Sequence, residues 1–132
     1  MMVCDASAIY KTIKSNRLEL LVGQCTSSIA VYELGNVIWK HAVLVKTYDQ
    51  KEANDLLNIC EGILEGMRVV HSDLNDIYQM AEKLRTSFYD AAYLCLAADL
   101  NVPLVTLDKK LARKASGSVK IITFDRFIQG AL

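Results

Sequence analysis

The chain has 132 residues, 52% of them hydrophobic, and its mean hydropathy is +0.20. This length predicts a single domain over residues 1–132, with enough apolar side chains for a substantial core. The 15 basic and 15 acidic residues give zero net charge, which argues against a protein that coats nucleic acid through a generally basic surface. No membrane segment is expected, because the apolar run from Ala91 to Ala98 is short and lies between Asp90 and Asp99.

The apolar share has two explanations that the sequence leaves open. It fits a compact domain that buries a whole sheet, and it also fits a domain that keeps an apolar face for a partner. The cysteines are widely spaced, at Cys4, Cys25, Cys60 and Cys95. Because His41 and His71 are also isolated, no zinc-binding pattern is present, and we expect buried thiols in a cytoplasmic protein.

The N-terminal stretch predicts the start of an α/β fold. Residues 1–4 form a short apolar run that ends at Asp5, and a helical pattern begins at Ser7. A buried strand excludes a charge from its middle but tolerates one where it leaves the sheet. In open parallel sheets, ligands bind at the carboxyl ends of the strands, so Asp5 is expected at the functional edge.

The rest of the chain alternates between short strands and helices. Apolar periodicity predicts, in order, a short helix at 16–23, a strand at 24–27, helices at 29–45 and 49–66, a strand or connector at 67–71, a helix at 74–84, a buried helix from 88, a strand at 102–106, a helix at 109–115, a strand at 120–123 and a short final helix. The expected helix caps are Ser27 or Ser28, Ser87, Asp108 and Asp125. This alternation predicts a three-layer α/β/α domain with a short parallel sheet. The helices at 29–45 and 49–66 should form a hairpin, which could serve as a dimer surface.

Four acidic residues stand at positions where they can meet. Asp5 follows the first strand, Glu33 lies inside an apolar helix, Asp90 begins a buried helix and Asp108 follows a late strand. Each alone is explained by helix capping or by a position on the surface. Helix N-termini in this architecture converge on one edge of the sheet, and carboxylates brought together there repel one another unless a cation joins them. Oxygen ligands without Cys or His favour Mg²⁺ or Mn²⁺.

An ordered set of short motifs accompanies these acids. The motifs are D-A-S at 5–7, Y-E-L-G-N at 32–36, F-Y-D-A-A-Y-L at 88–94 and T-L-D-K-K-L at 106–111. Together, in this order and at this spacing, they resemble a PIN domain of the VapC toxin group, and the resemblance covers essentially the whole chain.

This resemblance implies a metal-dependent endoribonuclease that acts on RNA and uses Mg²⁺ or Mn²⁺. It implies that the protein is the toxin of a type II toxin–antitoxin pair, a homodimer held inactive by a VapB-like antitoxin. By motif, the catalytic and metal-binding residues are Asp5, Glu33, Asp90 and Asp108, and the supporting residues are Ser7, Asn36 and Thr106.

Other functions remain open at this point. The same family contains housekeeping RNA-processing nucleases. A non-catalytic nucleotide-binding or protein-interaction module is a further alternative, although residues 5–7 replace the glycine-rich phosphate loop that nucleotide binding would favour. The basic residues at Lys109, Lys110, Arg113 and Lys114 fit a solvated helix face or contacts to RNA phosphates.

Overall fold

A five-stranded, fully parallel sheet forms the centre of the protein in the computed structural model, which describes residues 1–130. The strand order is β3-β2-β1-β4-β5. The strands are β1 (Val3–Cys4), β2 (Cys25–Ser27), β3 (Arg68–Val70), β4 (Leu104–Thr106) and β5 (Ile121–Thr123). The helices are α1 (Ala6–Lys14), α2 (Ala30–Trp39), α3 (Gln50–Glu65), α4 (Leu74–Leu84), α5 (Phe88–Leu100), α6 (Lys109–Ala115) and α7 (Phe124–Ile128).

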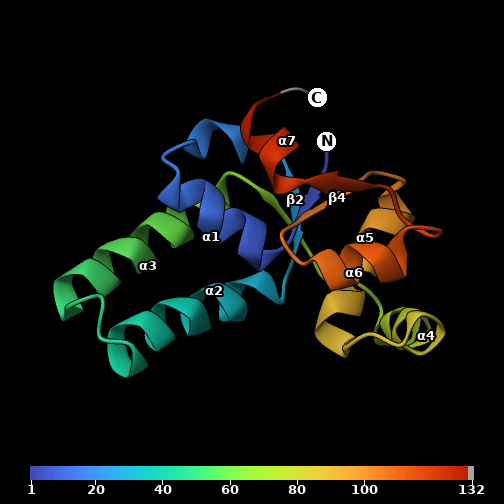
Figure 1. Ribbon diagram of the computed structural model, residues 1–132, viewed down its shortest axis with the longest axis horizontal. Helices are drawn as coiled ribbons and strands as arrows, with labels where there is room; N and C mark the ends of the chain where they lie inside the picture. The colour runs from blue at the N-terminus through green and yellow to red at the C-terminus, as the bar shows by residue number, and fades with distance from the viewer. Residues whose placement is uncertain (131–132) are drawn as a thin grey trace.

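Helices cover both faces of the sheet. Helix α1 contacts β1 and β4 from one face, and α5 contacts β1, β2 and β4 from the other. Figure 1 shows α1, α2 and α3 on one side of the strands and α4 and α5 on the opposite side. Residues 91–97 of α5 are all buried, because this helix is apolar on every side and packs between the sheet and α4. The predicted three-layer α/β/α architecture is confirmed.

The two long helices form the expected hairpin, which projects away from the sheet (Figure 1). Helix α2 continues as a π-helical segment, η2 (Lys40–Leu44), before the chain turns into α3. Side chains from three segments hold the end of the hairpin against α1. The hydroxyls of Tyr10 and Tyr48 are hydrogen-bonded, and the His41 ring stacks on Tyr10 with ring centroids 5.9 Å apart.

Two of the four expected helix caps are confirmed. Ser87 accepts a hydrogen bond from the Asp90 backbone N–H at 3.1 Å, and Asp108 accepts one from the Leu111 N–H at 3.0 Å. Asp49 and Glu52 form a reciprocal capping box at the start of α3.

Three local predictions were wrong. Asp125 does not cap α7: the helix begins directly after β5, so Thr123 caps it and Asp125 falls in its first turn. Residues 16–23 contain only a 3₁₀ turn, η1 (Leu18–Leu20), because left-handed residues at Asn16 (φ 57°) and Gly23 (φ 82°) bound it. At α2 the cap position is Ile29, with no side-chain capping bond from either preceding serine.

Burial agrees with one further expectation. All four cysteines are buried free thiols. Within residues 1–130, the helices are all too short or too polar to cross a lipid bilayer.

Candidate active site

A cavity of about 620 Å³ opens at the carboxyl edge of the sheet, and all four predicted acids line it. We call it the acidic cavity. Asp5 and Asp108 each lie directly or shortly after a strand, and Glu33 and Asp90 lie in the first turns of α2 and α5. The helix N-termini therefore bring together four carboxyl groups that are distant in the sequence.

Asp5 is the most deeply placed of these acids. It is 7% exposed, caps α1 by accepting a hydrogen bond from the Ala8 N–H at 2.9 Å, and accepts a second bond from the Ser7 hydroxyl at 2.6 Å. Burial raises the pKa of Asp5, and the charge of Asp90 adds to the rise, although the hydrogen bonds oppose it. A cation in the cavity would therefore stabilise the charged form of Asp5.

Glu33 is held from the opposite side of the cavity by a residue of α5. The Tyr93 hydroxyl donates a hydrogen bond of 2.5 Å to Glu33 Oε1. Burial raises the pKa of Glu33, the Tyr93 bond lowers it, and the charges of Asp90 and Asp5 raise it further. The carboxylates are therefore close enough to influence one another's protonation.

Asp90 and Asp108 complete the group. The Thr86 hydroxyl donates to Asp90 at 3.4 Å, and burial followed by the charge of Asp108 raises the pKa of Asp90. Asp108 caps α6 through the Leu111 N–H, while its own N–H donates to the Thr106 hydroxyl at 3.1 Å. Asp108 thus has a structural role in addition to its place in the cavity.

The three expected supporting residues lie near these acids but differ in what they contact. Ser7 binds Asp5 directly, and Asn36 lines the acidic cavity one turn after Glu33. Thr106 is not among the residues lining this cavity, but its hydroxyl accepts a hydrogen bond from the Asp108 backbone N–H, and its side-chain hydrogen bond lowers the pKa of Asp5.

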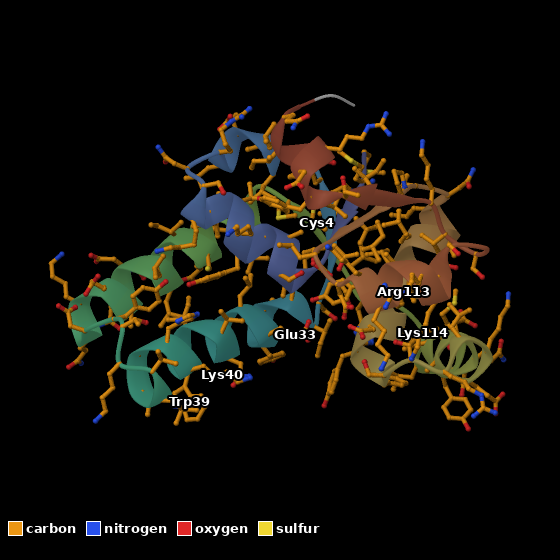
Figure 2. All side chains as sticks on the ribbon, viewed as in Figure 1. Cys4, Glu33, Trp39, Lys40, Arg113 and Lys114 are labelled. Carbon is orange, nitrogen blue, oxygen red and sulfur yellow. The ribbon has the colours of Figure 1, made fainter. Side chains whose placement is uncertain are left out.

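One cationic side chain lines the acidic cavity within the described part of the chain. Lys40, the first residue of η2, lies two helical turns after Glu33, and its ammonium group makes no ion pair among residues 1–130. On the other side of the sheet edge, the Lys114 ammonium donates to the Arg85 carbonyl at 2.7 Å, and its charge lowers the pKa of Asp90. Figure 2 shows Glu33 on α2, Lys40 where that helix continues into η2, and Arg113 and Lys114 on α6.

The donor set of the acidic cavity fits a hard divalent cation. Carboxylate, hydroxyl and amide oxygens surround it, and burial, with the neighbouring carboxylates, raises the pKa values of Asp5, Glu33 and Asp90. Among residues 1–130, however, no three Asp, Glu, His or Cys side chains are grouped tightly enough to hold a metal ion by themselves. Such an open arrangement suits Mg²⁺, which keeps several waters and binds through one or two carboxylates plus substrate phosphates.

Two residues of the cavity were missed by the sequence reasoning. Tyr93 looked like one more apolar member of a buried helix, yet it lies three residues after Asp90 and so on the same helix face. Lys40 lies seven residues after Glu33, which is the spacing of two helical turns. Helical spacing from the predicted acids was the signal that could have found both.

Two further cavities adjoin the acidic cavity along the edge of the sheet. An uncharged cavity of about 430 Å³, which we call the aromatic groove, shares Ile29, Tyr32 and Tyr89 with it. A cavity of about 280 Å³ on the other side shares Asp108 and is lined by Lys11 and Lys109. We call this one the lysine cavity. The three cavities follow the strand order across the sheet, from β2 and β3 to β4 and β5.

Comparisons with known proteins agree with this architecture. The PIN domain family model matches residues 2–117. The chain is 35% identical to Ribonuclease VapC3 of Pyrobaculum aerophilum over 124 residues, covering 86% of this chain and 93% of the relative. It is 32% identical to Exonuclease VapC9 of the same organism over 127 residues, covering 90% of this chain and 89% of the relative.

Solved structures share the fold at lower sequence identity. The crystal structure of PAE2754 from Pyrobaculum aerophilum superposes with a TM-score of 0.82 at 22% identity, covering 98% of this chain and 93% of that one. A toxin–antitoxin complex from Klebsiella pneumoniae has a TM-score of 0.65 at 14% identity, covering 94% of this chain and 98% of that one. From the family match and the two curated relatives, the chain belongs to the PIN-domain family and is a VapC-like member of it.

Proposed function

We propose that the protein is a divalent-metal-dependent endoribonuclease that hydrolyses phosphodiester bonds of single-stranded RNA at the acidic cavity. The observation that carries this proposal is the meeting of Asp5, Glu33, Asp90 and Asp108 around one cavity. Family membership supports a nuclease, and the names of the two curated relatives agree.

In this proposal the carboxylates, with Asn36, hold one or two Mg²⁺ or Mn²⁺ ions. A bound ion would supply Lewis-acid activation of water and neutralise charge that develops on the phosphate. Asp5, fixed by Ser7 and the Ala8 N–H, and Glu33, fixed by Tyr93, present pre-oriented oxygens to it. Lys40 offers a positive charge for an RNA phosphate next to the cleaved one.

Cleavage within the strand, rather than from an end, is supported by the neighbouring cavities. The acidic cavity is flanked by the aromatic groove on one side and by the lysine cavity on the other. An RNA strand can therefore enter from one side and leave from the other, which a site closed at one end would not permit. One relative is named an exonuclease, so the two modes need a direct test.

Circular single-stranded RNA separates these modes, because it has no ends. We expect the wild-type protein to linearise it with Mg²⁺ or Mn²⁺ and to leave it intact in EDTA. Asp5→Asn keeps the α1 cap, since Asn caps as well as Asp, but removes the charge. This variant should lose at least about a hundredfold in cleavage rate, as the loss of a metal ligand exceeds that of a supporting contact.

Asp55→Asn is the matched control, because Asp55 is exposed on α3 and, among residues 1–130, pairs only with Lys51. It should cleave like the wild type. Equal rates for Asp5→Asn and the wild type would place the active site elsewhere. Cleavage of linear but not circular RNA would favour an exonuclease.

The proposed biological role is that of a toxin held inactive by a small polypeptide antitoxin. VapC-like family membership supports this role, and one structural neighbour is titled a toxin–antitoxin complex. The four free thiols fit action in the reducing cytoplasm. Co-expression with the adjacent upstream reading frame should yield a stable complex that no longer cleaves RNA. If no such partner binds, a housekeeping RNA-processing role is favoured instead.

A further inference from the structure

The aromatic groove lies over the carboxyl ends of β2 and β3, beside the acidic cavity. Ser27, the last residue of β2, and Ser72, two residues after β3, line it. The N-terminal turns of α2, α4 and α5 form its walls, and the groove shares Tyr32 and Tyr89 with the acidic cavity. A ligand bound at the acidic cavity can therefore extend into the groove without leaving the surface of the protein.

The walls of the groove carry exposed aromatic rings and no charge. Tyr32 is 76%, Tyr89 58% and Phe88 41% exposed, and no Asp, Glu, Lys or Arg of the described residues 1–130 lines this cavity. Aromatic side chains with this exposure leave apolar ring surface in contact with water, and a flat ligand that stacks on the rings would bury that surface. Such a surface suits an uncharged ring rather than a phosphate.

The floor of the groove carries a hydroxyl without a partner. Ser72 is 8% exposed, and its side chain makes no hydrogen bond among residues 1–130. In that range, every side-chain oxygen or nitrogen that is fully inaccessible has a hydrogen-bond partner. The Ser72 oxygen has none, so it is at least partly accessible, and Ser72 lines the groove. Next to it, His71 Nδ1 lies 3.3 Å from the Ser28 hydroxyl. The Ser72 hydroxyl is therefore accessible to water and free to donate a hydrogen bond to, or accept one from, a ligand in the groove.

We propose that the aromatic groove binds one nucleobase of the RNA strand whose backbone crosses the acidic cavity. The base stacks on Phe88 and Tyr89, and the Ser72 hydroxyl bonds to its polar edge. This assignment rests on the proposed ribonuclease activity. A nucleotide joins a flat uncharged base to an anionic phosphate. The aromatic groove suits the base, and the adjoining acidic cavity, with its bound cation, suits the phosphate. The groove therefore gives the enzyme a preference for the base beside the cleaved bond.

An abasic scan of the substrate, combined with Phe88→Ala, tests this assignment. A short single-stranded RNA that the wild type cleaves at one bond is resynthesised with each nucleotide in turn made abasic. We expect one position beside that bond to lower kcat/KM about tenfold or more, as base–aromatic stacking contributes that much per base. Phe88→Ala should show a similar loss on the intact RNA and no further loss on the abasic RNA, because both changes remove the same contact.

Tyr78→Ala is the control for Phe88→Ala, since Tyr78 is an exposed aromatic residue of α4 that does not line the groove. It should keep the wild-type abasic profile. Ser72→Ala tests the assignment independently, so the test remains possible if Phe88→Ala does not fold. Because the hydroxyl has no protein partner, Ser72→Ala should melt at or above the wild-type temperature without RNA and yet discriminate less among RNAs that differ at the sensitive base.

The outcomes separate this assignment from the proposed function. A wild type that cleaves neither circular nor linear RNA overturns both. A wild type that cleaves but shows no sensitive base, or losses that add in the Phe88→Ala variant, overturns the groove assignment alone. Phe88→Ala with unchanged kinetics but without binding to the co-expressed polypeptide would identify a polypeptide site and also overturn it.

Discussion

The buried hydroxyl of Tyr93 determines where the Glu33 carboxylate lies. Tyr93 is 1% exposed, and burial, followed by the bond to Glu33, raises its pKa, so the group remains protonated and acts as a donor. Glu33 is half-buried and would otherwise be free to turn among rotamers. A residue of this kind touches no substrate and acts by orienting a carboxylate.

Removing only this hydroxyl should weaken metal-dependent activity without unfolding the protein. We expect Tyr93→Phe to require about tenfold more Mg²⁺ or Mn²⁺ for half-maximal cleavage, which is typical for a lost hydrogen bond to a ligand. A metal titration of the cleavage rate measures this, with Tyr78→Phe as the control on the surface of α4. An unchanged metal requirement would show that the Tyr93 bond does not position Glu33.

Asp90 and Asp108 differ in whether they cap a helix. Asp108 caps α6, whereas Asp90 is not a cap, because Ser87 holds that position in α5. Asn can replace Asp108 as a cap. Neither substitution should therefore destabilise a helix.

If both acids face a shared metal site, neutralising either one relieves repulsion in the metal-free protein. We expect Asp90→Asn and Asp108→Asn to melt at or above the wild-type temperature in EDTA. Added Mn²⁺ should then raise the melting temperature of the wild type more than that of either variant, since binding to the native state stabilises it. Thermal melts with and without Mn²⁺ decide this, and a full metal-induced shift in both variants would mean that these acids are structural.

At the scale of elements, the α2–α3 hairpin exposes an unusual amount of apolar surface. Trp39 is exposed at the end of α2, Val43 and Leu44 follow in η2, and Leu57 is exposed on α3. Within α2 the buried residues are Ala30, Leu34 and Ile38, so its apolar stripe is buried only in part. Exposed apolar patches of this kind often mark protein interfaces.

We therefore expect a homodimer formed through the hairpin. Leu44→Glu introduces a charge at a 61% exposed position and should give a monomer, whereas Val22→Glu, at a 66% exposed position outside the hairpin, should leave the dimer intact. Light scattering at high micromolar concentration measures both. A monomeric wild type would show that this surface serves another purpose.

At the scale of the whole molecule, folding brings several carboxyl groups to one sheet edge against their mutual repulsion. The pKa values of Asp5, Glu33 and Asp90 are raised first by burial and then by neighbouring carboxylates. Between the ordinary carboxyl values of about 4 and these raised values, the native state binds more protons than the unfolded state. This contribution to stability is therefore present at low pH and is lost as the pH rises through the raised values.

A comparison of variants isolates this effect from other titrating groups. In EDTA, the melting temperature of Asp90→Asn relative to the wild type should increase as the pH rises from about 4 toward neutrality. Melting curves over that range give the difference directly. A difference that is constant with pH, or that falls, would contradict the raised native pKa values.

The sequence by itself determined the local parts of this protein. Periodicity and polar residues at helix starts located the five strands and most helices, because these signals depend on residues within a few positions of one another. The strand–acid–helix junction at Asp5 and the Asp108 cap belong to this class. The errors, at residues 16–23, at the α2 cap and at Asp125, arose where two neighbouring positions could each begin or end a helix.

Only the tertiary structure decided which of these local parts share a surface. Glu33 and Tyr93 are 60 residues apart and meet because β2 and the β1–β4 pair lie side by side in the order β3-β2-β1-β4-β5, which differs from the order along the chain. The aromatic groove likewise exists only where the first turns of α2, α4 and α5 converge. Side-chain spacing along one helix is fixed by its geometry, but the pairing of helix ends depends on long-range strand contacts that no local pattern encodes.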